Sequence, residues 1–174
     1  GIDKNHLNED ALVSVKERIA RARHESLMKE QWSFYQSSLS EIGRQTERFQ
    51  QDMNTAQANI DRISQTLPIV NKRSEALKKL LSKQMVSEME FLEAEEKRIT
   101  LQQELIAERA RFGSVKASMQ QSRESKDRLI AETRSRYAEQ YSNLKGRLET
   151  TDYERNKANT RNELRVLKAV SYTH

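Results

Sequence analysis

The sequence predicts an all-α protein, a long antiparallel coiled-coil helical hairpin, and three observations lead to that prediction. Hydrophobic residues make up only 35% of the chain and charged residues 33%, so the chain cannot surround a thick core. Only four Gly and one Pro occur among 174 residues, which favours long uninterrupted helices. Apolar residues also recur in alternating steps of three and four, which is the spacing of a coiled-coil seam.

The first helix is expected over residues 7–81, with a break near residues 23–27 left open. Pro68 lies within this span, and we expect a local kink near Gln65 to Pro68 with the seam in register across it. A strict seam predicts a left-handed coiled coil. The expected seam positions are Met28, Trp32, Tyr35, Leu39, Ile42, Thr46, Phe49, Met53, Ala56, Ile60, Ile63, Leu67, Val70, Ser74, Leu77 and Leu81.

The second helix is expected over residues 88–168, after an apex turn at residues 82–87. Ser87, with Glu90 three residues later, fits a capping box. Because the two helices are similar in length and closely joined, we expect antiparallel pairing with residue i opposite about 170 − i. One straight helix that dimerises in parallel remains the alternative. The seam is expected at Ala94, Leu101, Leu105, Phe112, Val115, Met119 and Leu129, slips by about one residue near residues 126–133, and resumes at Tyr137, Tyr141, Leu144, Leu148, Thr151 and Ala158.

The whole chain, residues 1–174, is expected to form this single hairpin domain, with a different structure beginning at its end. Val166 and Val170 lie in a tail, residues 162–170, that gains β-branched residues and loses charge, which predicts the start of a strand. The next domain is expected to begin at residues 169–174. The sequence begins with Gly1 rather than Met, so we expect a piece of a longer protein whose targeting or anchoring segment lies outside it.

No pattern of catalytic, cofactor-binding or metal-ligating residues is present, and we predict a protein that is not an enzyme. His6, His24 and His174 lie near the two chain ends without partners at ligand spacing. The acidic residues at 93–96 are expected on a solvated face, because a two-helix rod offers no pocket to shift their pKa values. The net charge is +5 with mixed signs and no basic block, so no nucleic-acid partner is expected.

The apex is the one segment whose composition differs from its expected surroundings. Met85 and Val86 are apolar where solvent exposure should be greatest, which indicates a docking surface. The alternative is a turn that packs these two side chains back on its own helices. We call the following eight residues the docking tip: Leu80, Leu81, Ser82, Lys83, Gln84, Met85, Val86 and Ser87.

The run from Leu77 to Glu95 resembles the hairpin apex of periplasmic adaptors, also called membrane fusion proteins. The tail from Leu164 to Val170 is similar to the re-entry into the lipoyl-like domain of that family. The very long helices and the Lys83-Gln84 apex resemble most the HlyD-type branch of type I secretion. Drug-efflux adaptors carry an Arg, Leu and Ser triad at the tip, whereas Ala76 stands here at the position of the Arg.

The resemblance implies an adaptor that is located in the periplasm and anchored in the inner membrane through a segment outside this chain. Its implied partners are an inner-membrane ABC transporter, a TolC-like outer-membrane channel at the hairpin tip, and five further copies in a ring of six. The implied cargo is a large exported protein, such as a toxin or an adhesin. An adaptor of a tripartite drug efflux pump and a structural coiled-coil scaffold remain the alternatives.

Overall fold

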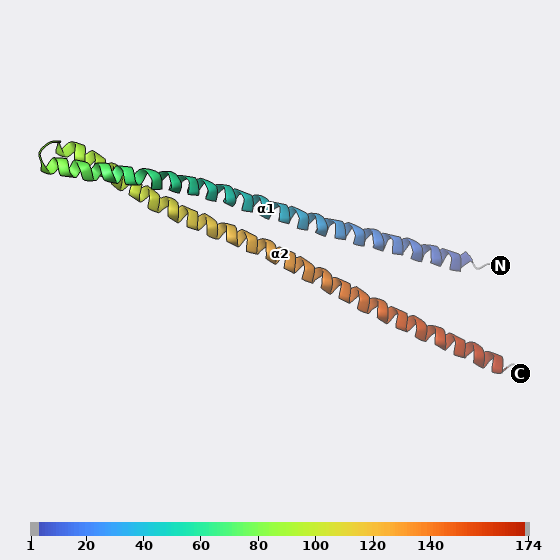
Figure 1. Cartoon of the computed structure of the whole chain (residues 1–174). Coiled ribbons are helices and arrows are strands. Elements are labelled where there is room, and N and C mark those ends of the chain that lie inside the picture. The colour runs from blue at the N-terminus through green and yellow to red at the C-terminus, as the bar shows by residue number, and fades with distance from the viewer. Residues whose placement is uncertain (1–3, 173–174) are drawn as a thin grey trace. The chain divides into compact units, whose positions relative to one another are not determined.

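The computed structural model describes residues 4–172, with side chains from residue 8 onward, and contains two long helices (Figure 1). Helix α1 spans Lys4–Ser82 and helix α2 spans Glu88–Ser171. The contacts divide the chain into two compact units, residues 1–126 and residues 127–174. The first unit holds α1 and the beginning of α2, and the second holds the rest of α2. The boundary falls where the predicted seam slips by one residue.

Helix α1 is continuous through residues 23–27, so it has no break there. It also continues through Pro68, which lacks the N–H that would bond to the carbonyl of Ser64. Pro68 and Ser64 are both exposed, so water can bond to that carbonyl. The seam keeps its register across the proline, with Ile63 and Val70 buried on its two sides. The expected kink stays a prediction.

In the first unit, a narrow seam between α1 and α2 replaces a globular core. A cluster of Ile63, Val70, Leu101 and Leu105 forms its centre, with Ile60 and Leu67 packed against it. Burying such side chains contributes about 1.5–3 kcal/mol each, and the predicted heptad spacing brings them to one face. Every predicted seam position of α1 from Thr46 to Leu81 is buried or half-buried.

The two helices of the first unit run antiparallel, as three side-chain contacts show. Thr46 bonds to Ser122 over 2.8 Å between their hydroxyl oxygens. Arg62 donates to Glu104 over 3.0 Å, and Ser74 donates to Glu95 over 2.6 Å. The two residue numbers of each pair add up to between 166 and 169, close to the expected 170. This confirms the antiparallel pairing and excludes one straight helix for the described chain.

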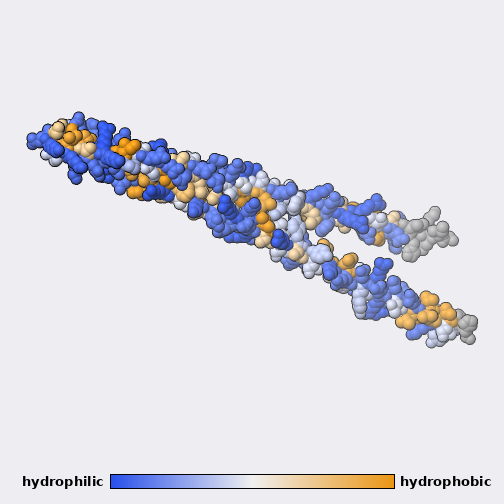
Figure 2. All heavy atoms as spheres, in the orientation of Figure 1, coloured by the Kyte–Doolittle hydropathy of each residue, from blue (hydrophilic) through white to orange (hydrophobic). Residues whose placement is uncertain are grey.

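The surface is mainly hydrophilic, with small apolar patches near the turn between the helices (Figure 2). Exposed pairs such as Lys29–Glu25 and Arg44–Glu41 lie three or four residues apart on one helix. Surface pairs of this kind contribute little each, because water and salt screen the attraction between exposed charges. Neither described helix contains a stretch apolar and long enough to cross a lipid bilayer.

The expected start of a strand in the tail, residues 162–170, is wrong, because α2 continues to Ser171. The start of the next domain at residues 169–174 stays a prediction. Val166 and Val170 are surrounded by Leu, Arg, Lys and Ala, which are strong helix formers. A strand also needs a neighbouring strand for its backbone hydrogen bonds, and residues 4–172 contain none. Thr173 and His174 lie outside the described residues.

Candidate functional site

Three backbone hydrogen bonds close the C-terminal end of α1, and two of them define its geometry. Met85 N donates to the carbonyl oxygen of Leu80 over 3.0 Å, and Gln84 N donates to that of Leu81 over 2.9 Å. This pair of bonds is a Schellman motif, in which the residue after the helix takes a left-handed conformation. That residue is Gln84, with φ of 58°. A side chain in this region costs about 1–2 kcal/mol, because Cβ crowds the backbone.

The N-terminal end of α2 is closed by the predicted capping box, which the structure confirms. Ser87 accepts a hydrogen bond on its hydroxyl oxygen from the backbone N–H of Glu90 over 3.2 Å. The Glu90 carboxylate accepts one from the backbone N–H of Ser87 over 3.2 Å. The pair satisfies two of the N–H groups that a helix start leaves unbonded. Caps on both sides therefore fix the path of the turn.

Within the docking tip, the structure separates outward side chains from inward ones. Met85 is 68% exposed, and Lys83 and Gln84 beside it are exposed too. Val86 is half-buried and turns back toward α1. The remaining members are Leu80 and Leu81, which are half-buried, and Ser82 and Ser87, which are exposed. Val86 thus fits the alternative of a side chain packed back on the hairpin, whereas docking through the exposed Met85 stays a prediction.

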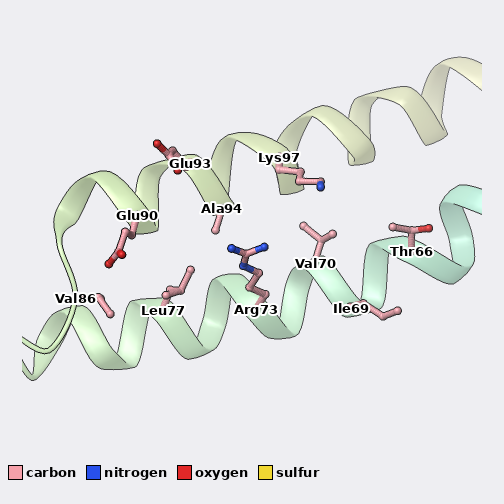
Figure 3. Close-up of a pocket in the computed structure, with 10 residues that line it drawn as sticks. All are labelled: Thr66, Ile69, Val70, Arg73, Leu77, Val86, Glu90, Glu93, Ala94 and Lys97. Atoms are coloured by element: carbon pink, nitrogen blue, oxygen red, sulfur yellow. The ribbon is translucent and has the colours of Figure 1, made fainter.

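Below the turn, α1 and α2 enclose a groove of about 590 Å³ (Figure 3). Val86, Leu77 and Ala94 supply apolar side chains to it, and Arg73 reaches into it from α1. The full lining is Thr66, Ile69, Val70, Arg73, Leu77, Val86, Glu90, Glu93, Ala94 and Lys97. The charged groups at its edge are of both signs, so the groove does not select for one charge.

One polar cluster crosses the seam close to the turn, and sequence reasoning missed it. Buried Ser74 donates to Glu95 Oε2 over 2.6 Å, and Arg98 Nε donates to the same oxygen over 3.0 Å. The bonds from Arg98 and then from Ser74 lower the pKa of the Glu95 carboxyl to about 2. The available signal was Ser74 itself, a polar residue at a seam position.

The residues at 93–96 therefore do not all lie on a solvated face as expected. Glu95 binds across the seam to Ser74, whereas Glu93 lines the groove and Glu96 is exposed. Among the residues that the structure describes, no three His, Asp or Glu side chains come together as metal ligands would. His24 is exposed, the side chain of His6 is not described, and His174 lies beyond the described residues.

The fold and the tip together define a class, a coiled-coil helical hairpin that displays side chains from a capped turn. Comparison with known protein families then identifies its relatives. The sequence matches the family described as CyaD, alpha-helical hairpin domain, over residues 4–165, and the chain belongs to this family. CyaD is an HlyD-type adaptor of a type I secretion system, so the predicted family membership is confirmed. No curated protein matches the sequence as a relative.

Proposed function

We propose that this chain is the helical hairpin of a membrane fusion adaptor in type I secretion, and that its docking tip binds a TolC-like outer-membrane channel. One observation carries the proposal. In a chain of the CyaD hairpin family, caps on both helices hold a turn from which Lys83, Gln84 and Met85 project into solvent.

The wider proposal follows from the family. The complete adaptor works in the periplasm, is anchored in the inner membrane, and forms a ring of six on an ABC transporter. It exports a large protein, such as a toxin or an adhesin, and it catalyses no reaction. The single helix α1, with 79 residues, is about 120 Å long at ~1.5 Å per residue. Such a helix covers a long distance with few residues.

The exposed apolar side chain of Met85 supports docking, because contact between apolar surface and water is unfavourable. Met85 leaves most of its surface exposed, and covering it with a partner would remove apolar area from water. Methionine also adapts its shape to irregular contacts. A channel mouth that covers Met85 would gain this burial without any change in the hairpin.

The substitution Met85→Asp in the full-length adaptor tests the proposal. A carboxylate at this position would have to be desolvated on docking, which is strongly unfavourable. We expect export of the cargo to be lost, while the helical content by circular dichroism stays at the wild-type level because the side chain is exposed.

Met89→Asp is the matched control. Met89 is also 68% exposed, but it lies in the first turn of α2, where an acidic residue is compatible with the helix dipole. We expect export to continue in this variant. Wild-type export with Met85→Asp, at normal adaptor levels, would overturn the docking role of the tip.

A further inference from the structure

Gln84 occupies a backbone position that glycine would fill at no steric cost. Its φ of 58° is the only positive value at a non-glycine residue in the described chain. Among residues other than glycine, Asn, Asp and His enter this region most readily, and glutamine is not one of that group. The Schellman geometry therefore favours glycine, whereas the sequence has a residue with a long polar side chain there.

The side chain of Gln84 makes no hydrogen bond within the described hairpin that would offset this strain. The turn is closed by backbone bonds at Leu80 and Leu81 and by the capping box at Ser87 and Glu90. The Gln84 carboxamide forms no hydrogen bond with any residue that the structure describes, and the residue is exposed. Its neighbours Lys83 and Met85 are exposed as well, so the group stands free at the end of the hairpin.

The three glycines that the structure describes lie elsewhere, at positions that do not require them. Gly43, Gly113 and Gly146 are inside helices, where glycine is unfavourable. A Cβ added at any of the three would meet nothing within 4 Å. A positive-φ glycine is absent from the described residues. The Schellman motif explains the conformation at this position, but local structure does not explain why glutamine rather than glycine occupies it, and strain of this kind concentrates at functional positions.

We infer that Gln84 is a specificity-determining residue, whose carboxamide pairs with a donor and an acceptor on the mouth of the channel. The inference rests on the proposed function and names the chemical group by which the docking tip recognises the channel. A carboxamide is neutral and both donates and accepts. Because the two caps already fix the backbone of Gln84, docking has to order only its side chain. Lys83 and Met85 flank it with a cation and an apolar group.

Three substitutions in the full-length adaptor, expressed with its transporter and channel, test the inference. Gln84→Gly keeps the turn and removes the side chain. Gln84→Asn keeps a carboxamide on a residue that tolerates positive φ. Gln84→Glu keeps the length but provides an acceptor only and adds a charge. Export of the cargo and the melting temperature of the purified adaptor are measured for each.

We expect Gln84→Gly to melt at or above the wild-type temperature while export falls about fivefold or more, as the loss of the carboxamide's hydrogen bonds to the channel implies. Gln84→Glu should lose export similarly, and Gln84→Asn should retain most of it. Wild-type export with Gln84→Gly overturns the inference, and so does a lower melting temperature in that variant. Met85→Asp separates the two proposals, because wild-type export in that variant removes the docking role altogether. Lost export there, with normal export in Gln84→Gly, removes only the role of Gln84.

Discussion

Ser74 of α1 donates a hydrogen bond from its hydroxyl to the carboxylate of Glu95 on α2, over 2.6 Å and across the seam. Ser74 is 4% exposed and Glu95 is half-buried, so this bond is partly shielded from water at a seam position. Arg98 holds the same carboxylate from the next turn of α2. A polar contact at a seam position favours one register over its neighbours, because a shifted pairing would leave the buried groups without partners.

Ser74→Ala should lower the free energy of unfolding by about 1 kcal/mol, the usual net contribution of one hydrogen bond. Urea denaturation of the purified protein measures the change. Ser64→Ala is the control, because Ser64 is exposed on the same helix, and we expect a negligible effect there. Equal stability of the Ser74 variant and the wild type would show that the bond contributes nothing to folding.

The pH dependence of folding should carry the signature of Glu95. Its pKa is about 2 in the folded protein, because of the bonds from Arg98 and Ser74, against an ordinary value of 4.5. The stability that it contributes is therefore complete above the ordinary value and is lost as the pH falls from about 4.5 to 2.

Glu95→Gln should have a shallower loss of stability across that range than the wild type. Chemical denaturation at a series of pH values compares the two proteins, and an NMR titration of the Glu95 carboxyl measures its pKa directly. Parallel pH profiles of wild type and variant would contradict the lowered pKa.

Ser87→Ala removes the hydroxyl from the capping box at the start of α2. We expect a loss of about 1 kcal/mol in the free energy of unfolding, which is typical for an N-cap. Ser82→Ala is the matched control across the turn. The Ser82 hydroxyl bonds only to the carbonyl of Lys79, within its own helix, and such a bond supports a helix little. A larger effect at Ser82 than at Ser87 would refute this assignment of the cap.

Thr46 and Ser122 form a second polar layer of the seam, farther from the turn. The Thr46 hydroxyl donates its hydrogen bond to the carbonyl of Ile42 over 2.8 Å. In the bond between Thr46 and Ser122, the Ser122 hydroxyl is therefore the donor. A double-mutant cycle with Thr46→Val and Ser122→Ala should give a coupling energy of about 0.5–1.5 kcal/mol. Strictly additive single effects would show that the two hydroxyls do not interact.

The helices and their pairing could be predicted from the sequence because heptad spacing reports directly on one buried face. The positions Ile63, Val70, Leu101 and Leu105 were on the expected seams, and all are buried. The capping box at Ser87 was likewise readable, because its two residues are three apart. These features depend on the spacing of residues that are close in sequence, so they can be recognised without knowing the positions of distant residues.

Four features needed coordinates. Ser74 and Glu95 are 21 residues apart in sequence, so a small error in register would have paired them with other residues. The opposite directions of Met85 and Val86 depend on the few backbone angles of the turn, and so does the positive φ of Gln84. The end of α2 was mistaken for a strand because Val166 and Val170 favour strands only where a neighbouring strand exists.

Site-specific photo-crosslinking in intact Gram-negative cells tests most directly whether the turn docks on an outer-membrane channel. The probe is placed at position 85 of the full-length adaptor, and at position 106 as a control, because Ile106 is also exposed but lies about 27 Å along α2 from its start. We expect position 85 to capture the outer-membrane channel and position 106 not to capture it. Capture of only the adaptor itself or of a cytosolic protein from position 85, with the channel present, would contradict the docking function and favour a structural coiled coil.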